Sequence, residues 1–210
     1  YPLGEGNTII KDIKFNNEKE IVDKYREWYN SVLPNSIKAD SDEFLEIKKE
    51  ACSNKSYYLR IDSTPPLGQS IGQDNLGCII SALINFYVLS KMDDYKGGFL
   101  CIDEIDVSLH PDAQERLVNL LDKLAGDLKL QIMISSHSLV FIKEVLKRYD
   151  QHPKDYVVGY LANNEHPYFK QVVSYDAIKK DLFALTSTIR PKVKVYFEDD
   201  ATQKVFDILV

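Results

Sequence analysis

The stretch Phe-Leu-Cys-Ile-Asp-Glu-Ile-Asp-Val-Ser-Leu-His-Pro, residues 99–111, decides how this chain folds. Its first four residues are apolar, follow two glycines and end abruptly at Asp103 and Glu104. A central strand of a parallel sheet is buried on both faces and delivers polar side chains at its carboxyl end. We therefore expect a strand at 99–102 that places both carboxylates at the edge of a parallel sheet.

The residues that follow this stretch complete a strand, helix, strand unit. Pro111 suits the first position of a helix, and leucines recur at helical spacing after it. A second apolar run, 131–134, then ends in Ser-Ser-His-Ser, residues 135–138. Because parallel strands need such a crossover, the pattern predicts an α/β fold with a parallel sheet flanked by helices.

The remaining elements are expected from periodicity and from turn residues. On the amino-terminal side, 18–33 predicts an amphipathic helix, and 74–90 is apolar on nearly every face, as in a helix surrounded by protein. A weaker helix is expected at 42–52, and a short strand at 57–61. On the carboxyl side, the expected elements are a helix at 139–149, a hairpin from 156–161 and 168–173, a helix at 175–188 and a strand at 193–197.

Two places carry residues suited to nucleotide chemistry. An acidic pair at a strand end divides the labour of hydrolysis, because Asp103 can help to hold Mg²⁺ while Glu104 polarises the attacking water. Adjacent acids are also common at strand ends and helix caps, so the pair alone leaves both interpretations open. Ser70 can cap the long apolar helix, where Gly72 would let the backbone approach a phosphate; a cap without a ligand is the alternative.

Residues 99–111 resemble the Walker B motif and D-loop of ABC-type P-loop ATPases. The ending Leu-His-Pro is similar to the branch that includes SMC-like proteins, the OLD (overcoming lysogenization defect) nucleases and their AAA relatives. In the same order as in that family, residues 135–138 resemble the H-loop, which implies that His137 contacts the γ-phosphate. Ser-Ile-Gly-Gln, residues 70–73, resembles the signature motif, with Ile71 in place of the usual glycine; Ser70, Gly72 and Gln73 would then bind nucleotide.

The resemblance implies ATP and Mg²⁺ as cofactors and an ATP-driven homodimer or higher homo-oligomer. In the family pattern, the nucleotide lies between one protomer's hydrolytic residues and the signature residues of a second. No GxxxxGK followed by Ser or Thr occurs in the 210 residues, so the loop that cradles the phosphates is missing. We expect the chain to be the C-terminal lobe of such an ATPase, truncated and inactive by itself.

The carboxyl end carries a second resemblance. Val-Lys-Val-Tyr-Phe-Glu, residues 193–198, looks like the opening strand and glutamate of a Toprim nuclease domain. This implies that Glu198 is a metal ligand and that the ATPase is coupled to nucleic-acid cleavage in phage defence. The family usually has glycine after this glutamate, whereas Asp199 follows here.

These observations divide the chain into three regions. Residues 1–55 are expected to be a helical insertion or a remnant of the N-terminal ATPase region, 56–189 the ATPase lobe, and 190–210 the start of a second domain. The alternative is a non-nucleolytic SMC-like ATPase that clamps DNA or regulates a separately encoded effector protein; a bare interaction scaffold is a third possibility. The formal charge of −6 leaves room for a local nucleic-acid patch, and the lack of a long apolar run favours a cytoplasmic protein without membrane contact.

Overall fold

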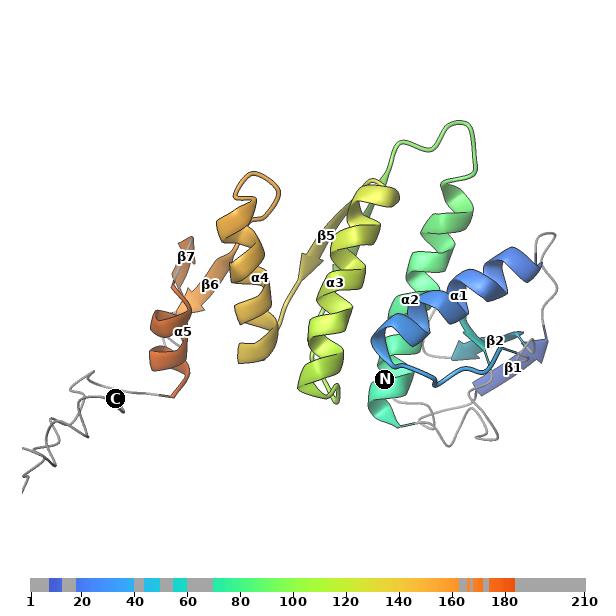
Figure 1. Cartoon of the computed structure of the whole chain (residues 1–210), viewed down its shortest axis with the longest axis horizontal. Coiled ribbons are helices and arrows are strands. Elements are labelled where there is room, and N and C mark those ends of the chain that lie inside the picture. Colours follow the sequence, from blue (N-terminus) through green and yellow to red (C-terminus); the bar gives the residue numbers. More distant parts are fainter. Residues whose placement is uncertain are drawn as a thin grey trace, which may run out of the picture. The chain divides into compact units, whose positions relative to one another are not determined.

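The computed structural model describes residues 8–12, 18–39, 44–49, 55–59, 70–162, 166, 168–171 and 174–183. Its contacts divide the chain into two compact units, Tyr1–Gly159 and Tyr160–Val210. Figure 1 labels the helices and strands in chain order. The strand, helix and second strand that the sequence predicts, with the loops that follow the two strands, lie in the first of these units.

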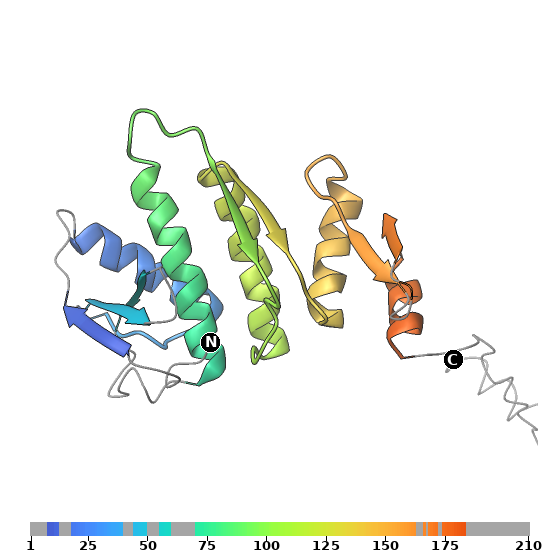
Figure 2. The ribbon, with the colours of Figure 1, turned by 180° about the vertical axis from the view of Figure 1, so that it is seen from behind.

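A parallel pair of strands forms the centre of the first unit. β4 (Gly98–Ile102) pairs with β5 (Leu130–Ile134), and the helix α3 (Pro111–Asp127) connects them. Figure 2 shows the two strands in front of α3, so the helix covers one face of the pair. The predicted α/β fold with a parallel sheet is confirmed. The leucines that recur along α3 are buried: Leu117, Leu120, Leu121 and Leu124.

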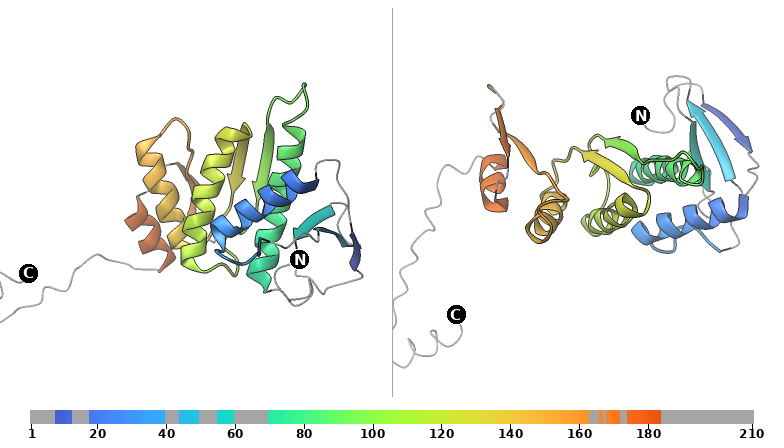
Figure 3. Two further views of the ribbon diagram at one scale, coloured as in Figure 1. Left: turned by 45° about the vertical axis from the view of Figure 1, so that its right-hand side comes forward. Right: turned by 90° about the horizontal axis from the view of Figure 1, so that it is seen from above.

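Two further helices pack with α3 around one apolar core. α2 (Ile71–Leu89) is the apolar helix, and Ser70 caps it: its hydroxyl accepts from the Gln73 N–H while the Gln73 side chain accepts from the Ser70 N–H. This reciprocal pair satisfies two amides that a helix start leaves open. α1 (Glu18–Val32) buries one face of its amphipathic pattern in the same core. In the left view of Figure 3, α1 crosses in front of α2 and reaches α3, and the contacts agree with this arrangement.

The helix expected at 42–52 is wrong. Within that range the structure has a strand, β2 (Phe44–Lys49), which pairs antiparallel with β1 (Thr8–Asp12) on one side and with β3 (Lys55–Leu59) on the other. A short run with two or three apolar residues fits helical and strand periodicity equally well. The hydrogen bonds that β2 makes to β1 and β3 decide between the two, and the residues of β2 alone do not show them.

The remaining elements follow β5. The helix α4 (Leu139–Gln151) agrees with its expectation, with Ser138 at its N-cap. β6 (Gly159–Ala162) pairs with β7 (Tyr168–Gln171), which confirms the paired strands. The last described helix is α5 (Tyr175–Leu182). The expected strand at 193–197 lies outside the described residues. Within the part of the chain that the structure describes, no helix is long and apolar enough to cross a membrane.

Candidate active site

The ends of β4 and β5 are joined by their backbones. The Ser135 N–H donates to the Ile102 carbonyl at 3.0 Å, and the Ile105 N–H donates to the Ser135 carbonyl at 3.2 Å. The loop after β4, residues 103–110, and the loop after β5, residues 135–138, therefore begin side by side. The acidic pair begins the first of these loops, and the histidine belongs to the second.

Ser135 connects this edge to both members of the acidic pair. Its hydroxyl donates to Oδ1 of Asp103 and accepts from the Glu104 N–H at 2.9 Å. Glu104 has a φ of 50°, in the left-handed region that side chains other than glycine rarely adopt. The two bonds hold the carboxylate of Asp103 and the backbone of Glu104 from one atom, while the side chains of both acids stay exposed.

Asp106 makes a second connection between the loops. Its Oδ1 accepts from the Ser136 hydroxyl at 2.6 Å and from the backbone N–H of His137 at 3.2 Å. Asp106 is half-buried, whereas the His137 ring is on an exposed residue. Sequence reasoning singled out neither Ser135 nor Asp106 as a site residue; the available signal was a third acid behind the pair, facing a serine-rich strand end.

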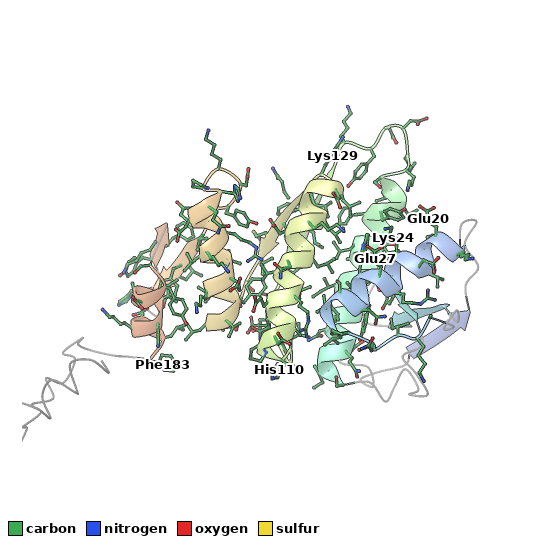
Figure 4. All side chains as sticks on the ribbon, viewed as in Figure 1. Glu20, Lys24, Glu27, His110, Lys129 and Phe183 are labelled. Atoms are coloured by element: carbon green, nitrogen blue, oxygen red, sulfur yellow. The ribbon has the colours of Figure 1, made fainter. Side chains whose placement is uncertain are left out.

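A buried glutamine on α3 forms hydrogen bonds to both of these loops. Gln114 donates from Nε2 to the Leu109 carbonyl at 2.9 Å and accepts from the Ser138 hydroxyl at 2.5 Å. His110 sits at the N-cap of α3, where its Nδ1 accepts from the Asp112 N–H at 3.4 Å; Figure 4 labels it at that end of the helix. Part of the Leu-His-Pro ending therefore caps a helix.

The start of α2 lies against the loop that carries the acidic pair. A Cβ added to Gly72 would come within 2.2 Å of the Ser108 carbonyl oxygen, so only glycine fits this close packing without movement. Asn75 donates from Nδ2 to the Val107 carbonyl at 3.3 Å. Gly72 thus has a packing reason of its own, while Ser70 is exposed at the helix end. The loop 103–110 therefore contacts both the histidine loop and the signature-like stretch.

The acidic pair borders a hollow between α2 and β4. Apart from the acids, most of its lining is apolar: Ile71, Cys78, Ile79, Ala82, Leu100, Cys101, Ile102, Ile105 and Val107, with Asn75. In the described part of the chain, no group of three or more His, Cys, Asp or Glu residues could hold a metal ion. Mg²⁺ in nucleotide sites is bound through one or two carboxylates and the substrate phosphates, so Asp103 fits as a single protein ligand. Glu198 lies outside the described residues.

Comparison with known proteins adds the family. Residues 5–142 match a family whose description is "AAA ATPase domain". The chain belongs to this family. The match supports an ATP-binding ATPase of the P-loop class. The matched residues include the signature-like stretch, the acidic pair and the histidine loop. None of the curated proteins matches the chain.

Several solved structures resemble this chain, and one of them is described here. A structure from work on ATP-driven dimerisation and DNA-stimulated activation of SMC ATPases aligns with 12% identity. The alignment has a TM-score of 0.47 and covers 77% of this chain and 89% of the other. The family assignment of the AAA ATPase domain therefore rests on the sequence match.

Proposed function

We propose that this chain supplies the hydrolytic residues of an ABC-type ATPase. Asp103 binds Mg²⁺, Glu104 acts as the general base toward the attacking water, and His137 contacts the γ-phosphate. The observation that carries this proposal is the joining of the two strand ends through Ser135, because it places the acidic pair and the histidine loop at one edge. All three side chains belong to exposed residues, as groups that meet a ligand must.

The positions of the two acids fit different parts of the reaction. Within the described residues, Ser135 engages only Oδ1 of Asp103, so Oδ2 stays available to a cation. Mg²⁺, when bound, neutralises charge that develops on the phosphates. Glu104 has a positive φ, as Ser108 of the same loop does, and the Glu104 N–H is fixed by the same serine. Backbone strain of this kind persists where surrounding contacts hold it, and it is concentrated at functional sites.

The start of α2 supports a second part of the proposal, a homodimer or higher homo-oligomer. Ser70 lies at the amino end of a helix of 19 residues, where open amides and the helix dipole favour an anion. Its hydroxyl oxygen accepts a capping bond, and its proton can still be donated to a phosphate. We propose that Ser70, with Gly72 and Gln73, binds the nucleotide held by a second protomer.

The phosphate-binding loop would come from residues outside these 210, since no GxxxxGK followed by Ser or Thr occurs in them. We propose residues 56–189 as the ATPase lobe, with 1–55 as an insertion or a remnant of the N-terminal region. Because cradling of the phosphates needs the missing loop, the 210 residues alone would not turn ATP over. The proposed setting is the cytoplasm.

The proposed parent is an OLD-like effector in which ATP state controls nucleic-acid cleavage in phage defence. Residues 190–210 would begin the Toprim-like domain, with Glu198 as a metal ligand; the support is the sequence resemblance of 193–198. A non-nucleolytic ATPase that clamps DNA or controls a separate effector protein is the alternative. A complete acidic motif after Val210 in the parent would favour the first, and its absence the second.

The test compares Glu104→Gln with Glu115→Gln in the protein that contains both this chain and the phosphate-binding loop. Glu115 is an exposed glutamate on α3 and serves as the matched control. We expect Glu104→Gln to bind ATP normally and to lose at least about 100-fold in turnover, because general-base catalysis contributes on that order. Glu115→Gln should match the wild type. Undiminished turnover in Glu104→Gln would remove Glu104 from this role.

A further inference from the structure

Asp106 lies on the loop that carries the acidic pair, but it has no role in the reaction proposed above. Its Oδ1 accepts two hydrogen bonds from the neighbouring loop, from the Ser136 hydroxyl at 2.6 Å and from the His137 N–H at 3.2 Å. A carboxylate makes stronger hydrogen bonds than a neutral acceptor does. The loop after β5 is therefore held by a charge that belongs to the loop after β4.

The bond to the His137 backbone matters because Ser135 and Ser138, on either side of Ser136 and His137, are anchored by other groups. Ser135 is held through its bonds to Ile102 and Ile105, and the Ser138 hydroxyl donates to Gln114. The N–H of His137 donates to Asp106 alone among the described residues. His137 is an exposed residue, so the position of its backbone sets where the ring can reach.

The geometry points to Asp106 as the positioning residue of His137. We propose that Asp106 fixes the backbone of His137 so that the ring reaches the γ-phosphate, an inference that rests on the proposed function. Asp106 touches neither nucleotide nor water in this scheme, and it acts through the histidine. A displacement of about 1 Å at a reacting group can cost on the order of 100-fold in rate, so loss of this anchor should be visible in turnover.

The placement of Asp106 also links His137 to α2. The residues that directly follow Asp106 pack on that helix, where the Ser108 carbonyl meets Gly72 and the Val107 carbonyl accepts from Asn75. The same short segment thus contacts the histidine loop on one side and the signature-like stretch on the other. A purely structural brace would affect stability, whereas a positioning residue affects the rate through one partner.

The experiment uses the complete protein with its phosphate-binding loop. We would compare Asp106→Ala, Asp106→Asn, His137→Ala and the double variant Asp106→Ala/His137→Ala. Asp127→Ala, at the opposite end of α3, is the control for loss of an exposed acid. Turnover number, ATP affinity and the melting temperature would be measured for each, together with deuterium exchange of the peptide that contains His137.

The expected pattern is specific to positioning. Asp106→Ala should lower kcat by about 10- to 100-fold with ATP affinity retained, and should speed exchange at His137. Asp106→Asn should recover most of the rate, because its amide oxygen still accepts. The double variant should be no slower than His137→Ala alone, since residues that act as one unit are not additive. Asp127→Ala should match the wild type.

Two results would overturn the inference. Losses that multiply in the double variant would mean that Asp106 does not act through His137. An Asp106→Ala protein with wild-type turnover and unchanged exchange at His137 would remove the positioning role altogether. Failure of the proposed function has a different signature, because Glu104→Gln and His137→Ala would then turn ATP over like the wild type, whereas the exchange at His137 would still report on its bond to Asp106.

Discussion

The loops after β4 and β5 are held by polar side chains, whereas the junction of α1 with α2 is held by buried aromatic rings. In the loops, single atoms of Ser135 and Asp106 each serve two hydrogen bonds, and the acids and the histidine stay exposed. In the junction, Tyr25 and Tyr29 are each 1% exposed. The contrast separates the part of the first unit that we expect to set stability from the part that we propose to carry the chemistry.

The aromatic junction has specific geometry as well as burial. The rings of Tyr25 and Tyr29 stack with centroids 6.0 Å apart, and Trp28 meets Tyr87 of α2 edge-on at 5.8 Å. Such pairs add to the area that each ring buries. A change in this junction should therefore act mainly on the free energy of unfolding, and a change at the strand ends mainly on the rate of hydrolysis.

The largest effect is expected from Trp28→Ala, which should lower the free energy of unfolding by about 3–5 kcal/mol. Trp28 is 4% exposed, so its removal leaves a cavity between the two helices. Urea unfolding followed by circular dichroism measures the loss. Trp28→Phe should retain most of the stability, and a Trp28→Ala protein as stable as the wild type would contradict the assignment of the core to this junction.

The next effect tests where the two regions touch. Gly72→Ala places a Cβ within 2.2 Å of the Ser108 carbonyl oxygen, so the backbone must shift, at a cost of about 1–3 kcal/mol. Because Ser108 belongs to the loop of the acidic pair, this variant should also lose turnover. Both quantities would be measured in the complete protein.

Gly126 provides the matched control for that substitution. It lies in α3, and an added Cβ there meets no atom within 4 Å. Gly126→Ala should raise stability by up to about 1 kcal/mol, since alanine favours a helix over glycine, and should leave turnover unchanged. Equal effects of the two substitutions would show that helix propensity, and not the contact with Ser108, governs position 72.

A smaller effect is expected from Ser135→Ala, which removes the hydroxyl between Asp103 and Glu104. We expect turnover to fall by about 10-fold, in line with loss of orientation at two groups. The melting temperature should change little, because water can replace the hydroxyl at this exposed position. Ser135→Thr retains a hydroxyl and should restore the rate. If Ser135→Ala lost stability but kept its turnover, the strand-end loops would set stability and not the rate, contrary to our proposal.

The strand, helix, strand unit could be predicted because apolar runs, a proline and turn residues mark it locally. The cap of α2 by Ser70 could likewise be predicted, since serine is among the residues preferred at an N-cap. β2 could not be read from its own residues, because strand pairing with β1 and β3 decides it. The roles of Ser135 and Asp106 could not be predicted from the sequence for a similar reason, because they depend on how two loops contact each other in the folded chain.

The smallest effect is expected from Tyr29→Phe, which tests the junction by pH. The Tyr29 hydroxyl donates to the Gln73 carbonyl at 3.4 Å, a long bond whose removal should cost less than about 1 kcal/mol near pH 7. Burial raises the pKa of Tyr29 well above its ordinary value, because the phenolate would lose its hydration. The folded protein therefore keeps the proton that the unfolded chain releases above about pH 10.

This difference gives the pH dependence its sign. A group whose pKa is raised by folding contributes stability below its unfolded pKa and loses that contribution as the pH rises toward the folded pKa. Wild-type stability should therefore fall between about pH 10 and 11 more steeply than that of Tyr29→Phe, while Tyr25, whose pKa burial also raises, keeps contributing in both proteins. Urea unfolding at pH 8 and at pH 11 measures the two slopes. Identical slopes would mean that Tyr29 is hydrated in the folded protein, and the junction would then be open to water in the way that the strand-end loops are.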